Sequence, residues 1–112
     1  MTDSKLDLLQ GTLDLMVLQT LGALGRLHGY AIAARIEQVS EGAIQLNMGT
    51  LYPALVRLEQ RRLIRARWAT TENNRRARLY ELTPAGHKHL ELERAGWQHM
   101  AGIMERLLNN EF

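Results

Sequence analysis

Two short segments in which apolar and polar residues alternate, separated by a polar turn, do most to limit what this chain can fold into. The first lies within residues 63–69 and the second within 78–83, and the intervening turn contains two asparagines and two arginines. Alternation at a period of two residues is typical of a strand, and a polar turn of this length joins antiparallel neighbours. We therefore expect a two-stranded hairpin.

Elsewhere, apolar residues recur at the three- and four-residue spacing of amphipathic helices. This spacing predicts four helices, over residues 4–24, 30–39, from Asn47 or Thr50 to about Arg61, and from Thr83-Pro84 to about Asn109. Residues 43–46 alternate instead and predict a further short strand between the second and third helices.

The predicted helix ends and buried faces follow from particular residues. Ser4 and Asp7 resemble an N-capping pair for the first helix, and the alternative is a later start at Gly11 or Thr12. Gly42 supplies a left-handed position after the second helix. Pro53 is tolerated only near a first turn, so the third helix should start close by. We expect two apolar stripes to face the core, from the second helix (Ile32, Ala33 and Ile36) and the third (Leu51, Leu55 and Leu58).

The predicted order is helix, helix, short strand, helix, strand, strand, long helix. Three helices and a two-stranded hairpin form the winged variant of the helix-turn-helix, so the fold class expected is mainly α with a small β-hairpin. We expect a winged helix-turn-helix domain over residues 1–83 and a long C-terminal dimerisation helix over 84–112. A chain of 112 residues buries only about two-thirds of its unfolded surface, and dimerisation would add stability.

Basic residues are concentrated between Arg57 and Arg78. This segment carries eight arginines against two acids, Glu59 and Glu72, so its net charge is +6 while the whole chain has +2. A local excess of positive charge indicates a surface that binds a polyanion. The alternative is an ordinary solvated helix face and hairpin.

Other features of the composition exclude several kinds of protein. The chain has no cysteine, which excludes disulfides, thiolate metal sites and cysteine nucleophiles. Acids rather than bases lie near its start, and no apolar run is long enough to span a bilayer, so we expect a cytoplasmic protein without a membrane partner. The four histidines have no partners at metal-ligand spacing, and we expect no metal and no cofactor. No glycine-rich phosphate loop or nucleophile elbow occurs, so we do not expect an enzyme.

The third helix and the hairpin turn are the expected contacts to double-stranded DNA. A recognition helix places its N-terminal residues against base edges, while hydroxyls and arginines contact phosphates. An arginine-bearing wing lies along the backbone or enters the minor groove. Arg57 has an alternative role as the partner of nearby acids, and the turn has one as a solvated loop. The predicted contact residues are Gln45, Asn47, Gly49, Thr50, Tyr52, Pro53, Arg57, Asn73, Asn74, Arg75 and Arg76.

Three motifs in this order make the chain resemble the PadR family of bacterial transcriptional regulators. They are LHGYAI at 27–32, GTLYPAL with RLE at 49–59, and NRRARLYELTPAG at 74–86. The short C-terminal part resembles the compact branch with one dimerisation helix, and residues 11–14 with 73–76 resemble the acidobacterial subgroup. The resemblance implies that Tyr52 contacts DNA and that Tyr80 packs at the base of the wing. Glu81 stands where family wings often carry a second aromatic residue, so a DNA contact by Tyr80 is not expected.

The C-terminal helix carries apolar residues at an average spacing of 3.5, which is typical of helix pairing. The residues expected in a homodimer contact are Leu90, Trp97, Met100, Met104 and Leu107. A multidrug-sensing branch of the family that the chain resembles stacks flat aromatic compounds between tryptophans of this helix. The resemblance therefore implies a small planar aromatic effector at Trp97, and the alternative is a plain interface anchor.

Together these features predict a ligand-responsive repressor that binds a palindromic operator as a homodimer. Repression is expected by analogy with the family's usual mode. The alternative is a winged-helix module that binds proteins rather than specific DNA sequences.

Overall fold

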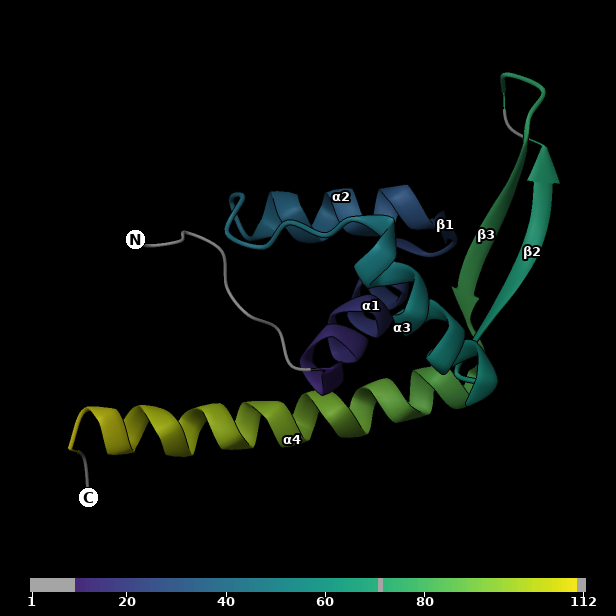
Figure 1. Ribbon diagram of the computed structural model, residues 1–112. Helices are drawn as coiled ribbons and strands as arrows, with labels where there is room; N and C mark the ends of the chain where they lie inside the picture. Colours follow the sequence, from purple (N-terminus) through teal and green to yellow (C-terminus); the bar gives the residue numbers. More distant parts are fainter. Residues whose placement is uncertain (1–9, 71, 111–112) are drawn as a thin grey trace.

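The computed structural model describes residues 10–70 and 72–110, which form four helices and a small antiparallel sheet (Figure 1). The expected fold class, mainly α with a hairpin and a long C-terminal helix, is confirmed. The predicted cap at Ser4 and Asp7 lies outside the described residues. The elements are α1 (Gln10–Leu24), β1 (Leu27–His28), α2 (Gly29–Val39), α3 (Met48–Gln60), β2 (Ile64–Thr70), β3 (Arg76–Leu82) and α4 (Pro84–Leu108).

The predicted hairpin is confirmed, but the predicted short strand at residues 43–46 is wrong. Strands β2 and β3 pair from Ile64↔Leu82 to Thr70↔Arg76. The third strand is β1, which pairs with the other edge of β3 and gives the order β1-β3-β2. Residues 43–46 do not pair with a strand, because two of their backbone N–H groups donate to Ser40, just before the segment. The N–H of Ala43 donates to the Ser40 carbonyl, and that of Ile44 donates to the Ser40 hydroxyl.

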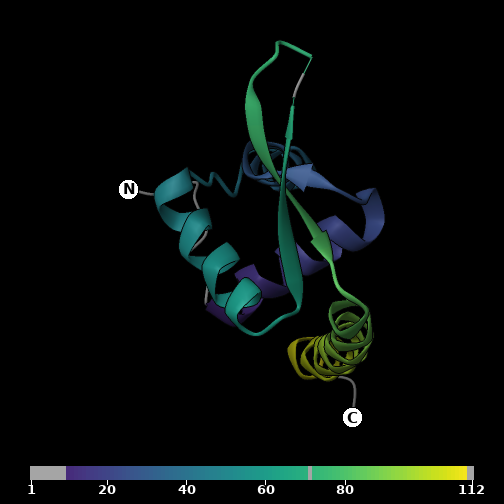
Figure 2. The ribbon, with the colours of Figure 1, turned by 90° about the vertical axis from the view of Figure 1, so that its right-hand side faces the viewer.

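The core lies between α1, α2, α3, the base of the hairpin and the first turns of α4. The predicted stripes of α2 and α3 are buried, and Leu51, Leu55 and Leu58 are completely so. Ile64, Tyr80 and Leu82 close the core from the hairpin base. The rest of the hairpin rises away from the helices, with α3 on one side and β1 on the other (Figure 2).

The helix ends follow most of the expected signals. Asn47 caps α3, Thr83 caps α4 with Pro84 as its first residue, and Gly42 adopts a positive φ of 84° after α2. Pro53 differs from the expectation, because α3 begins five residues before it and the proline lies inside the helix. The carbonyl that loses its N–H partner belongs to Gly49, an exposed residue, where water can satisfy it.

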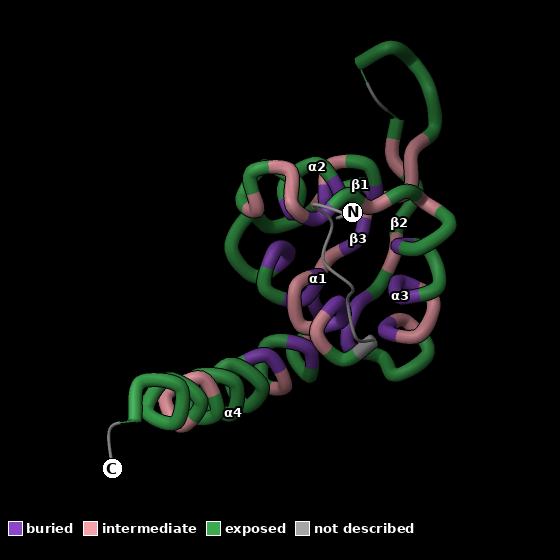
Figure 3. Tube along the Cα trace, turned by 60° about the vertical axis from the view of Figure 1, so that its left-hand side comes forward, coloured by how far each residue is buried: buried purple, intermediate pink, exposed green. Residues whose placement is uncertain are grey.

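Among the described residues, helix α4 is anchored to the domain mainly through its first turns. Gly86 packs so closely on Leu63 that a Cβ at this position would overlap the Leu63 carbonyl oxygen. Leu90 is only 4% exposed and belongs to the core of its own subunit, which differs from the expectation that it lies in a dimer contact. Beyond Leu90 the helix leaves the body and is mostly exposed (Figure 3). Within the described ranges, no helix has both the length and the apolar character needed to cross a membrane.

Candidate nucleic-acid interface

The N-terminal part of α3 presents a polar exposed surface. Asn47 fixes the start of the helix, because its Oδ1 accepts a hydrogen bond from the Thr50 N–H at 2.9 Å. The buried stripe turns the opposite side of the helix to solvent, and Tyr52 is 47% exposed there. The structure leaves exposed, just before α3 and within its first turns, the sequence-predicted residues Gln45, Asn47, Gly49, Thr50, Tyr52 and Pro53.

Arg57 lies apart from this surface. Its guanidinium donates to the Asp14 carboxylate at 2.8 Å. The Arg57 side chain is partly buried and the Asp14 side chain is mostly buried. The structure therefore shows the second of the two roles considered for Arg57, as the partner of an acid. This ion pair joins α3 to α1 and fixes the orientation of the helix whose N-terminus is exposed.

The tip of the hairpin carries the second group of predicted contact residues. Asn73, Asn74, Arg75 and Arg76 are all exposed. Asn74 has a φ of 58°, a left-handed conformation that asparagine tolerates better than most residues. The turn therefore projects amide and guanidinium groups away from the body of the domain.

The side of the hairpin that faces α3 carries two further residues, Trp68 and Arg78, which the sequence reasoning missed. Arg78 donates to Glu59 of α3 at 3.0 Å, which places this side of the wing next to the helix. The Arg76 and Arg78 guanidinium carbons lie 4.7 and 5.9 Å from the centroid of the Trp68 ring. The strand register brings these residues together, because Trp68 lies opposite Arg78 and Thr70 lies opposite Arg76.

Tyr80 lies at the base of this side and is buried, as the resemblance implied. Burial raises the pKa of its hydroxyl above the ordinary tyrosine value, while the nearby Arg78 opposes the rise. The Arg78 guanidinium carbon is 6.0 Å from the Tyr80 ring centroid. Tyr80 therefore packs in the core at the base of the wing and contributes little to the exposed surface of the wing.

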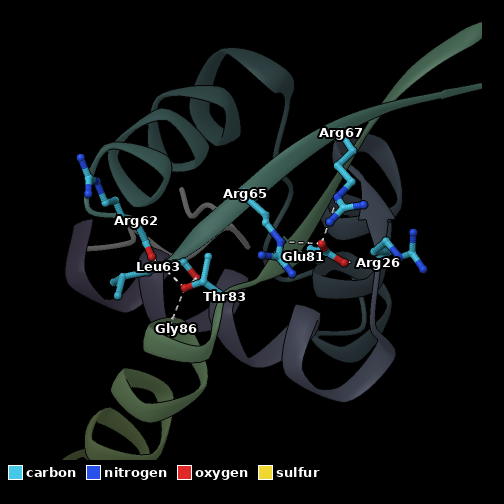
Figure 4. Close-up of polar contacts among 8 residues, drawn as sticks. All are labelled: Arg26, Arg62, Leu63, Arg65, Arg67, Glu81, Thr83 and Gly86. Atoms are coloured by element: carbon cyan, nitrogen blue, oxygen red, sulfur yellow. Dashed lines mark hydrogen bonds and ion pairs between the residues drawn. The ribbon is translucent and has the colours of Figure 1, made fainter.

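The opposite side of the hairpin holds one carboxylate among three arginines (Figure 4). Glu81 accepts from Arg65 at 2.6 Å, and Arg26 and Arg67 each lie 3.4 Å from its carboxylate. The hydrogen bond from Arg65, together with the three positive charges, lowers the pKa of the Glu81 carboxyl below its ordinary value. Glu81 ties the loop before β1 to the wing and cancels one of the three charges.

The exposed part of α4 presents an apolar surface on a single chain. Of the predicted dimer residues, Trp97, Met100, Met104 and Leu107 are about half exposed. Trp97 also borders a cavity of about 380 Å³, whose other lining residues come mainly from α1 and α2 and include apolar side chains of both helices. Among the described residues, histidine and carboxylate side chains do not gather in a group of three that could hold a metal ion.

Comparison with known proteins gives one family match that covers most of the chain. A family model described as the transcriptional regulator PadR-like family matches residues 17–92. A curated relative from Streptomyces fradiae, an uncharacterized 37.1 kDa protein in transposon TN4556, is 46% identical over 78 residues, which make up 70% of this chain. The chain spans about a fifth (21%) of the length of that relative.

Several solved structures resemble the chain over most of its length. A PadR family transcription regulator from hypervirulent Clostridium difficile is 30% identical, with a TM-score of 0.73 over 86% of this chain and 97% of the other. A transcriptional regulator from Clostridium thermocellum is 26% identical, with a TM-score of 0.76 over 87% and 90% of the two chains. A Streptococcus mutans protein at 20% identity, with a TM-score of 0.83 over 96% and 95%, shares the fold. The resemblance to the PadR family is confirmed, and the chain belongs to the PadR-like family of transcriptional regulators.

Proposed function

We propose that this regulator binds double-stranded DNA through α3 and the wing. The observation that carries the proposal is the exposed polar start of α3 beside a hairpin whose tip bears asparagines and arginines. In a winged helix, a helix start in the major groove and a hairpin on the flanking backbone make complementary contacts. Residues 1–83 are the DNA-binding part in this proposal.

Each exposed residue has chemistry that suits one kind of DNA contact. The hydroxyls of Thr50 and Tyr52 donate to phosphate oxygens, and the amides of Gln45 and Asn47 reach bases or backbone. At the wing, arginine supplies positive charge and a planar fork of donors. Asn47 already uses its Oδ1 to cap α3, so its amide N–H₂ is the group that it offers to DNA.

We also propose that two copies pair through the exposed part of α4, residues 84–112 being the dimerisation helix. The four half-exposed apolar side chains recur every three or four residues beyond Leu90. Nothing else in the described part of the chain buries them further, and a second copy of the helix would cover them. A twofold dimer matches a palindromic operator with half-sites about one helical turn apart.

The regulatory mode in this proposal is repression that a small planar aromatic effector relieves. A half-exposed indole at the edge of an apolar cavity supports such an effector, because flat aromatic and cationic molecules stack on tryptophan. A Trp97→Ala variant should lose the response to such compounds or weaken the dimer. If the ligand titration and the dimer are both unchanged, Trp97 has neither role.

The DNA contact is tested by binding the protein to a duplex from the region upstream of its own gene. We expect Tyr52→Ala and Arg75→Ala to weaken binding, and Arg75→Ala to reduce the slope of log affinity against log salt by about 1 because one phosphate contact is lost. Arg94→Ala is the matched control, since Arg94 lies on α4 and pairs with Glu91. Sedimentation should show that the Tyr52→Ala variant of α3 and the Arg75→Ala variant of the wing both remain dimeric.

Normal binding by both variants would place the DNA contact elsewhere on the molecule. Binding that is absent, or that salt does not affect, would favour the winged-helix protein-interaction module instead.

A further inference from the structure

Trp68 is a large aromatic residue in an unusual place. It lies on β2 in the projecting part of the hairpin and is 58% exposed, so it does not serve the core. Its described ring contacts are the guanidinium groups of Arg76 and Arg78, both within the roughly 6 Å at which a cation interacts with an aromatic face. An exposed tryptophan that contacts two arginines indicates a role at the surface of the wing.

The strand register explains why these residues meet. Trp68 lies directly opposite Arg78, and Arg76 lies opposite Thr70, two residues further along the same face. Long side chains reach both direct and diagonal neighbours across an antiparallel pair. The Arg78–Glu59 ion pair shows that this face is the one turned toward α3.

The two arginines differ in their other contacts. Arg78 is paired with Glu59, which offsets its charge. Within residues 10–70 and 72–110, Arg76 forms no ion pair, and it is the closer of the two to the indole ring. A guanidinium that lies against a ring keeps its positive charge, and its N–H groups point outward from its edge.

We propose that Trp68 is a positioning residue that holds Arg76 ready for a DNA phosphate on the α3-facing side of the wing. A free arginine side chain loses rotamer freedom when it binds, and a side chain already held in place loses less. This inference rests on the proposed DNA-binding function. It adds Trp68, which contacts Arg76 rather than DNA, to the residues that set affinity.

The test measures binding of the full-length protein to a duplex from the region upstream of its own gene, at several salt concentrations. Trp68→Leu keeps apolar bulk but removes the ring, and we expect it to weaken binding about 2- to 5-fold, the range for an exposed cation–π contact. Trp68→Phe keeps a ring and should restore affinity to within about twofold of wild type. The double variant Trp68→Leu/Arg76→Ala should bind no more weakly than Arg76→Ala alone.

Arg67→Ala is the matched control, because Arg67 lies on the same strand but on the opposite face with Glu81. Its effect should add to that of Trp68→Leu. The positioning role is wrong if Trp68→Leu binds DNA like wild type, or if Trp68→Phe does not restore the affinity. It is also wrong if the losses of affinity from Trp68→Leu and Arg76→Ala add in the double variant. Failure of the wild-type protein to bind the duplex would overturn the proposed function and this inference together, whereas the other outcomes leave DNA binding intact.

Discussion

The contact between Gly86 and Leu63 makes a sharp prediction about stability. An alanine at Gly86 would drive its Cβ into the Leu63 carbonyl, so the start of α4 must move away from Leu63, the residue just before β2. That carbonyl accepts from the Thr83 N–H at 3.0 Å, and the Thr83 hydroxyl donates to the Arg62 carbonyl at 2.7 Å (Figure 4). The same hydroxyl oxygen accepts from the Gly86 N–H at 2.9 Å, so the substitution strains the whole helix start.

The magnitude follows from these contacts. Strain from overpacking costs about 1–3 kcal/mol, and each weakened hydrogen bond adds about 1 kcal/mol. Alanine recovers about 1 kcal/mol of helix propensity. With one hydrogen bond weakened, the last two contributions cancel, so we expect Gly86→Ala to lower the free energy of unfolding by about 1–3 kcal/mol.

Urea unfolding followed by circular dichroism, at one fixed protein concentration, measures this change. Gly96→Ala is the control on the same helix, because a Cβ there meets nothing within 4 Å. It should leave stability unchanged or raise it by up to about 1 kcal/mol. A Gly86→Ala variant as stable as the wild type would show that α4 does not pack on Leu63 as described.

Three further substitutions test other contacts. Glu81→Gln should lower the thermal midpoint at neutral pH. Because the Arg65 hydrogen bond lowers the pKa of the Glu81 carboxyl, the stability that this carboxylate contributes is present above the ordinary value of 4.5 and is lost as the pH falls below it. The midpoints of wild type and variant should therefore converge in acid, and a difference that persists there would refute the contribution of the ionised carboxylate. Asn47→Ala should destabilise the protein by about 1 kcal/mol in a urea titration through loss of the α3 cap, and no change would mean that the cap is dispensable. Met104→Glu should shift the sedimentation profile to monomer while Leu92→Glu, outside the predicted dimer residues, should not, and a Met104→Glu dimer would exclude pairing along α4.

Much of the fold was predictable because its signals are local. The apolar stripes of α2 and α3 and the alternation of the hairpin are each contained within a short segment. The short strand was placed wrongly because four alternating residues cannot be distinguished from a bend. The actual third strand, Leu27–His28, lies more than fifty residues before its pairing partners Leu79 and Tyr80 in β3.

The candidate site was predictable only in outline. Burial of one side of α3 implied that Thr50 and Tyr52 face solvent, and the structure agrees. The pairing of Arg57 with Asp14 spans 43 positions, and the contact of Trp68 with Arg76 depends on the strand register. The first contact arises from tertiary packing, which local periodicity does not specify, and the second arises from cross-strand pairing within the hairpin.

Footprinting of the protein on the region upstream of its own gene tests the central claim most directly. We predict two protected half-sites about one helical turn, roughly 34–36 Å, apart, as a dimer with one α3 in each major groove requires. Affinity should fall steeply as salt rises, because arginines of the wing displace counterions from phosphates. A lack of protection, or binding that is the same at low and high salt, would contradict a dimeric DNA-binding regulator.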